Sequence, residues 1–207
     1  MANDRTPQRG KIVMFCSPSS GEGKTTVALG MAGAATKSNL RTVLVDFDPS
    51  AKGAGALLGI AAPRLVQKTA DPQDLCISTT TSPALDIVFA SFTADDPEPL
   101  CSYLRNMYDL IIIDAPNLDS EEGAVWLAAH VDSIVIVVAA GRTTERRLVN
   151  ALNRLSVNQP FILGGVLNQA AASSEAGKAT LAYPYGTGLW TQVKTRFRRK
   201  QQHERVG

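Results

Sequence analysis

The stretch that decides the fold reads Ser17-Pro18-Ser19-Ser20-Gly21-Glu22-Gly23-Lys24-Thr25-Thr26. An apolar run, Ile12 to Cys16, precedes it and has the length of a short buried strand, and a helical pattern of small and apolar residues follows it. Strand, glycine-bearing loop and helix are the context of a phosphate-binding loop, or P-loop. Its glycines allow consecutive backbone N–H groups to turn toward one anion, and the helix start and the lysine add positive charge. The stretch therefore predicts a nucleotide site.

The loop departs from the strict pattern G-x-x-x-x-G-K-[ST] at its first position, which is Pro18 here. A glycine-rich turn alone would be ambiguous, but the sequence from Gly21 to Thr26 between a strand and a helix is far more specific. Lys24 is expected on the β- and γ-phosphates, and the Thr25 hydroxyl on Mg²⁺. The predicted nucleotide-binding residues of the loop are Ser19, Ser20, Gly21, Glu22, Gly23, Lys24, Thr25 and Thr26.

Acidic residues close two later apolar runs. Thr42 to Val45 leads into Asp46 and Asp48, and Leu110 to Ile113 leads into Asp114. Functional groups of parallel sheets sit just beyond the carboxyl ends of the strands, and an aspartate there is the second half of a P-loop site, next to Mg²⁺. For Asp46 and Asp48 taken alone, an ordinary solvated strand end remains the alternative.

Apolar runs and helical patterns alternate from about residue 10 to Asn168. This pattern predicts an α/β fold with one doubly wound, mostly parallel sheet flanked by helices. Residues 1–10 are expected to be a flexible leader, 11–187 the P-loop ATPase domain, and 188–207 a basic amphipathic tail. Trp126 is expected to pack against the domain, and His130 and His203 are assigned no role.

Composition places the chain among ordinary globular proteins. Its 207 residues carry a formal net charge of +2, and its three cysteines, Cys16, Cys76 and Cys101, lack the spacing of metal ligands. The thiols are expected to be reduced, and the sequence shows neither a signal peptide nor an apolar run of membrane-spanning length. We therefore expect a cytoplasmic protein. No base-reading motif is visible, so nucleic acid is not an expected partner.

Together these motifs resemble the deviant Walker ATPases, which include the MinD/ParA proteins and the bacterial tyrosine kinases (BY-kinases). Gly21 to Thr26 resembles the BY-kinase Walker A motif more than that of MinD/ParA, whose signature lysine would fall at Ser19. Tyr108 to Pro116 resembles the BY-kinase Walker B motif, and the likeness continues through Gly141-x-Thr143 to Asn168, over roughly residues 10 to 170.

The resemblance implies ATP and Mg²⁺ as ligands and assigns roles to individual residues. Asp46 and Asp48 match the Walker A′ acids, which bind Mg²⁺ and poise the attacking oxygen, and Asn168 matches the asparagine that contacts adenine. The implied catalytic residues are Lys24, Asp46 and Asp48, and the implied metal ligands are Thr25, Asp46 and Asp114. Tyr183 and Tyr185 are the candidate phosphoacceptors, although BY-kinase tails carry a larger tyrosine cluster.

The function implied is that of a BY-kinase of exopolysaccharide or capsule biosynthesis, which phosphorylates itself on tyrosine. Its expected partners are the cytosolic end of a membrane-embedded chain-length protein and further copies of itself, in a dimer or ring. The alternative is a MinD/ParA-type switch that hydrolyses ATP to regulate or position a partner, without kinase activity. A binding module that has lost turnover is disfavoured because the acidic residues are intact.

The carboxyl-terminal segment has a character of its own. From Lys194 to Gly207 the sequence has six Lys and Arg residues and only one Glu. Just before and within this stretch, apolar residues recur at helical spacing: Leu189, Trp190, Val193 and Phe197. One interpretation is an interfacial helix that binds anionic membrane through residues 188–200, at the inner face of the membrane. The other is a solvated basic end whose few apolar residues pack on the domain.

Overall fold

The computed structural model describes residues 9–47, 53–60, 77–80, 85–90, 97–119, 122–156, 158 and 160–170. All of them belong to the first of two units, Met1–Ala171; the second is Ala172–Gly207. The description below concerns the first unit alone.

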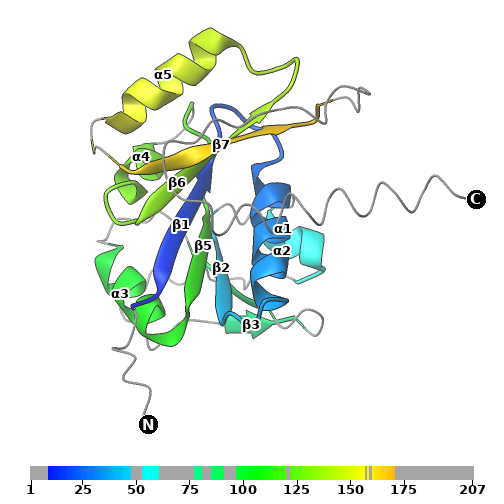
Figure 1. Cartoon of the computed structure of the whole chain (residues 1–207), viewed down its shortest axis with the longest axis vertical. Helices are drawn as coiled ribbons and strands as arrows, with labels where there is room; N and C mark the ends of the chain where they lie inside the picture. Colours follow the sequence, from blue (N-terminus) through cyan, green and yellow to red (C-terminus); the bar gives the residue numbers. More distant parts are fainter. Residues whose placement is uncertain are drawn as a thin grey trace, which may run out of the picture. The chain divides into compact units, whose positions relative to one another are not determined.

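Seven strands form one sheet in the order β3-β4-β2-β5-β1-β6-β7 (Figure 1). Every pairing is parallel except that of β3 with β4, which is antiparallel. The strands are β1 Lys11–Cys16, β2 Thr42–Asp46, β3 Ile77–Thr79, β4 Asp86–Phe89, β5 Leu110–Asp114, β6 Ser133–Ala139 and β7 Ile162–Asn168. The expectation of a doubly wound, mostly parallel sheet is confirmed.

Helices cover both faces of this sheet. Figure 1 shows α1 (Lys24–Thr36) and α2 (Ala54–Leu58) on one side, and α3 (Glu98–Met107) and α4 (Glu122–Leu127) on the other. The fifth helix, α5 (Glu145–Ser156), connects β6 to β7. Right-handed crossovers account for this division, because the chain moves toward β4 through α1 and α2 and returns toward β7 through the later helices.

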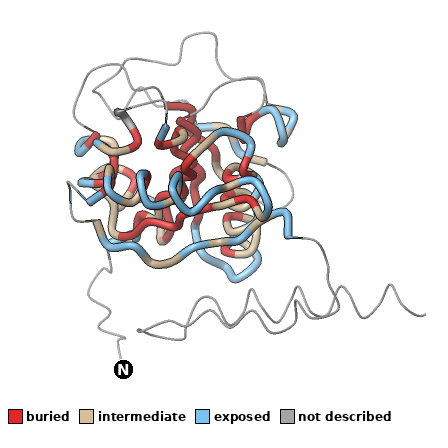
Figure 2. The backbone as a smooth tube through the Cα atoms, turned by 90° about the horizontal axis from the view of Figure 1, so that it is seen from above, coloured by how far each residue is buried: buried red, intermediate tan, exposed pale blue. Residues whose placement is uncertain are grey.

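The core lies in the central strands, as the burial colours of Figure 2 show. Every residue of β2 and β5 is buried, which is why their sequences read as continuous aliphatic runs without alternation. In α5, Ala151 and Leu155 are buried and Leu148 and Leu152 pack beside them, so these four residues form the inner stripe of this helix. Burial on both faces holds the strand ends in fixed register, and the site depends on that register.

Two details differ from the sequence expectations. The edge strand β3 was not predicted, because three residues of mixed polarity give no periodic signal. The expectation that Trp126 packs is met only in part: the residue is 39% exposed, and its ring makes an edge contact with His130, 5.6 Å between centroids. Neither difference affects the strand ends that carry the site.

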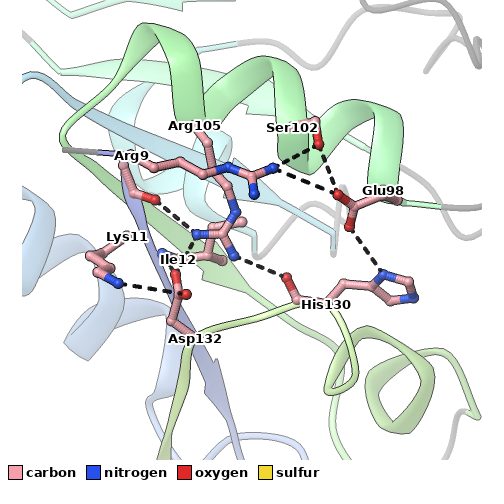
Figure 3. A network of polar contacts seen from close by, with 9 residues as sticks. Arg9, Lys11, Ile12, Glu98, Ser102, Arg105, His130 and Asp132 are labelled. Carbon is pink, nitrogen blue, oxygen red and sulfur yellow. Dashed lines mark hydrogen bonds and ion pairs between the residues drawn. The ribbon is translucent and has the colours of Figure 1, made fainter. Parts of the chain in front are cut away.

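Ion pairs stabilise the end of the sheet where the parallel strands begin (Figure 3). Arg105 Nη1 donates to Asp132 Oδ2 at 2.5 Å and to the Gly10 carbonyl at 2.8 Å, and the same carboxylate oxygen accepts the Ile12 N–H at 2.7 Å. Helix α3 is thereby tied to the starts of β1 and β6. Nearby, Glu98 accepts a hydrogen bond from Ser102 at 2.8 Å, and its other oxygen lies 3.6 Å from His130 Nδ1.

We expect Asp132 to make stability depend on acid pH. Burial by itself raises the pKa of Asp132, but the hydrogen bonds from Arg105 and Ile12 and the neighbouring positive charges outweigh it and hold this pKa below its ordinary value. A depressed folded pKa gives stability that is present above the unfolded value of about 3.9 and is lost as the pH falls through the folded value. Urea unfolding should show Asp132→Asn less stable than wild type at pH 7, and the difference should shrink below pH ~4. A difference that stays constant with pH would contradict this assignment.

Candidate active site

The P-loop runs from Ser17 to Gly23, between β1 and α1. Gly21 and Gly23 have φ of 75° and 84°, in the left-handed region that favours glycine. A Cβ at Gly23 would lie 2.0 Å from Asn168 Nδ2, so a side chain at this position is also excluded by space. Helix α1 begins after Gly23 with no side-chain hydrogen bond capping it. The first backbone N–H groups of the helix can therefore serve an anion, as the sequence predicts.

Lys24 connects the P-loop to the end of β5. Its Nζ lies 2.7 Å from Asp114 Oδ1, and the side chains of the two residues are 9% and 0% exposed. The pair joins the predicted phosphate-binding lysine to the predicted Walker B acid, which are 90 residues apart in the chain. The sequence predicts that both residues belong to one site, and the structure brings them into contact.

Asp46 lies beside Asp114 at the same edge of the sheet. The two residues are paired in the register of β2 and β5, and both are fully buried. Asp46 Oδ2 also accepts a hydrogen bond from the Gly55 N–H at 3.2 Å, at the start of α2. Buried parallel strands thus place two carboxylates next to each other beside the start of α1.

This donor set suits Mg²⁺. Among the described residues no group of three or more His, Cys, Asp and Glu side chains could hold a metal by itself. Mg²⁺ is held by one or two carboxylates together with waters and substrate phosphates, and does not need a cage made of protein alone. Asp46, Asp114 and the half-buried Thr25 provide that kind of partial set.

The P-loop is also held from the ends of β6 and β7. Arg142 donates to the Gly21 carbonyl at 3.0 Å, and Gln169 donates to the same carbonyl at 3.2 Å. Asn168 Nδ2 donates to the Glu22 carbonyl at 2.9 Å, and the Thr143 hydroxyl donates to the Glu22 carboxylate. Arg142, Thr143 and Gln169 were not among the predicted site residues. In the sequence, Thr143 is marked only by its place in the Gly141-x-Thr143 likeness. Arg142 and Gln169 are marked only by position, directly after two apolar runs that end at the same edge of the sheet.

The outer end of the loop contacts the segment after β5. The Ser19 hydroxyl donates to Asp119 at 2.5 Å, and the backbone N–H groups of Leu118 and Asp119 donate to the carbonyls of Ser17 and Pro18. Pro18 can occupy the first position of the motif because its carbonyl, and not its missing N–H, is what the neighbouring segment uses. Ser20 and Thr26 are exposed in the loop and the first turn of α1.

Cys16 ends β1 beneath the P-loop and is fully buried. Burial raises the pKa of its thiol to about 12, and the nearby charge of Lys24 offsets this only in part. The thiol is therefore protonated at neutral pH and unsuited to nucleophilic chemistry.

Three predicted residues and the tail lie outside the described residues. The three residues are Asp48, Tyr183 and Tyr185, and the tail is the whole segment 188–207. Their roles stay predictions, and so do the domain limits at residues 10 and 187. In the part of the chain that is described, no helix combines the length and the apolar character that crossing a bilayer requires.

The chain is similar to known nucleotide-binding proteins. The family model of the CobQ/CobB/MinD/ParA nucleotide binding domain matches residues 13–181. The tyrosine-protein kinase CpsD of Streptococcus agalactiae is 26% identical over an alignment of 182 residues, which covers 80% of this chain and 78% of CpsD.

Two solved structures extend the likeness to three dimensions. The VpsO kinase domain is 28% identical, with a TM-score of 0.64 over 80% of this chain and 88% of that one. Cobyrinic acid a,c-diamide synthase from Mycobacterium smegmatis, solved with a bound ATP analogue and magnesium, has a TM-score of 0.65 over 76% of this chain and 74% of its own. At 18% identity its likeness concerns the fold alone.

Proposed function

Because this chain belongs to the CobQ/CobB/MinD/ParA nucleotide-binding domain family, we propose that it binds Mg-ATP at the P-loop and transfers the γ-phosphoryl group to tyrosine, as a BY-kinase. Support for ATP binding comes from one arrangement. Lys24, Asp46 and Asp114 meet at the carboxyl ends of β1, β2 and β5, next to the uncapped start of α1. Phosphoryl transfer depends mainly on charge neutralisation and on positioning of the reacting groups. These residues and the helix start can supply both.

Support for tyrosine as the acceptor comes from the relatives. CpsD is named a tyrosine-protein kinase, and VpsO a kinase domain, and each aligns with most of this chain. In the proposed reaction Lys24 exchanges Asp114 for the β- and γ-phosphates and stabilises the charge that grows on the transferred group. An acidic residue at 46 or 48 orients and deprotonates the attacking phenol. Thr25, Asp46 and Asp114 would hold Mg²⁺, which when bound would neutralise part of the phosphate charge.

The wider setting is proposed on the same basis. The partner is the cytosolic end of a membrane-embedded chain-length protein of exopolysaccharide or capsule synthesis, and the protein works as a dimer or ring in the cytoplasm. Asn168, whose amide already lies on the P-loop, is proposed to contact the adenine. The basic segment 188–200 is proposed to bind anionic lipid at the inner face of the membrane.

The direct test is incubation of the full chain with Mg-ATP, followed by phosphotyrosine detection and by measurement of released phosphate. We expect phosphotyrosine in the wild type and loss of most of it in the double variant Tyr183→Phe, Tyr185→Phe, which should keep its ATP affinity because the phenols are acceptors. A signal that survives at full strength would move the acceptor to a partner or to Tyr103 or Tyr108. Phosphate release without any phosphotyrosine would favour the ATPase switch instead.

A further inference from the structure

Glu22 belongs to the P-loop, yet its carboxylate is hydrogen-bonded to other residues of the protein. The residue is only 3% exposed. Its Oε2 accepts a hydrogen bond from the Ser19 N–H at 3.0 Å, and its Oε1 accepts one from the Thr143 hydroxyl. A buried carboxylate needs hydrogen-bond donors of this kind. Burying it without them costs much more free energy than a single hydrogen bond contributes.

Thr143 in turn is fixed to the sheet. Its hydroxyl oxygen accepts the Ala139 N–H at 2.9 Å, at the last residue of β6. The hydroxyl therefore receives one hydrogen bond and gives one, as a hydroxyl can. A continuous chain of hydrogen bonds leads from the end of β6 through Thr143 and Glu22 to the N–H of Ser19.

The same side of the loop is held through its carbonyls. Gly21 O is engaged by Arg142 and Gln169, and Glu22 O by Asn168. In a planar trans peptide the C=O of one residue and the N–H of the next point in opposite directions. Carbonyls turned toward β6 and β7 therefore turn the N–H groups of Glu22 and Gly23 the other way. These are the amides that the P-loop presents to phosphate.

We propose that Glu22 and Thr143 are a positioning pair that fixes the P-loop from the β6 side, so that its amides face the phosphates before the nucleotide arrives. The inference rests on the proposed nucleotide site and assigns no contact with ATP to either side chain. Preorganised donors bind better because they need no reorganisation when the ligand arrives. Loss of the pair should weaken every ligand that carries the phosphates, whether or not it carries a base.

The experiment measures the affinity of the full chain for Mg-ATP and for magnesium tripolyphosphate, by competition with a fluorescent ATP analogue. Tripolyphosphate has phosphates but no ribose or base. We expect Thr143→Val to weaken both ligands by the same factor, about tenfold, and Thr143→Ser to restore both. Thr79→Val is the matched control, because the Thr79 hydroxyl also donates to a carboxylate, that of Asp86, where β4 begins at the other end of the sheet. It should leave both affinities unchanged.

A double-mutant cycle with Glu22→Ala completes the test. The double variant Glu22→Ala, Thr143→Val should lose hardly more affinity than Glu22→Ala alone, because the two residues act as one unit. Unchanged affinity in Thr143→Val, additive losses, or weaker ATP with unaltered tripolyphosphate would each overturn the positioning pair while leaving the nucleotide site standing. Wild type that binds neither ligand would overturn the nucleotide site itself, and the pair with it. A lower melting temperature at full affinity would also count against the pair, since that is the signature of a merely structural contact.

Discussion

Lys24→Met should lower ATP turnover and tyrosine phosphorylation at least ~10²-fold, the loss typical of one preorganised electrostatic group. The substitution removes the charge proposed for the β- and γ-phosphates and leaves the backbone of the loop in place. Radiolabelled phosphate transfer and phosphate release measure the two outcomes with the same samples. Turnover at the wild-type level in this variant would rule out the P-loop as the catalytic site.

The same substitution should have a second effect that follows from burial. Lys24 is paired with Asp114 at 2.7 Å where neither side chain is more than 9% exposed. Removing one partner of a buried pair leaves the other charge uncompensated and costs about 3–5 kcal/mol of unfolding free energy. The double variant Lys24→Met, Asp114→Asn has no such charge, so it should regain most of the lost stability in urea unfolding. It should regain no activity, and this separates the role in folding from the role in turnover.

Where the chemistry is local, the sequence is enough to predict a site. Residues 17 to 26, between an apolar run and a helical pattern, predict a phosphate loop, because glycine freedom, lysine charge and helix start are properties of neighbouring residues. Asp46 and Asp114 are predictable for a related reason: each follows a run of buried aliphatics, and the ends of parallel strands share one edge.

Contacts between distant segments are what the sequence does not specify. Thr143 and Gln169 reach the P-loop from about 120 and 150 residues away along the chain, and nothing in their local pattern points to Glu22 or Gly21. The direction of the Glu22 side chain is equally hidden, because a glutamate in a loop is expected to face water. Edge strand β3 is unpredictable for another reason, since only its pairing with β4 makes it a strand.

Gly23→Ala should weaken nucleotide binding, and ATP turnover should fall at least about 10²-fold, since misplacement of the reacting groups by about 1 Å can cost that much in rate. At φ 84° an alanine is strained, and its Cβ would lie 2.0 Å from Asn168 Nδ2. The loop or the Asn168 amide must shift, and the hydrogen bond to the Glu22 carbonyl is lost with it.

Gly30→Ala is the matched control for this substitution. Gly30 lies inside α1, where a Cβ meets nothing within 4 Å. Alanine there should leave the affinity for ATP unchanged and raise stability by about 0.5–1 kcal/mol, as expected for glycine replaced in a helix interior. Adding Asn168→Ala to Gly23→Ala relieves the steric clash but not the strain in φ, and it removes the proposed contact to adenine, so binding should recover only in part. Wild-type affinity in Gly23→Ala would mean that the loop does not hold its phosphate-binding shape through Gly23.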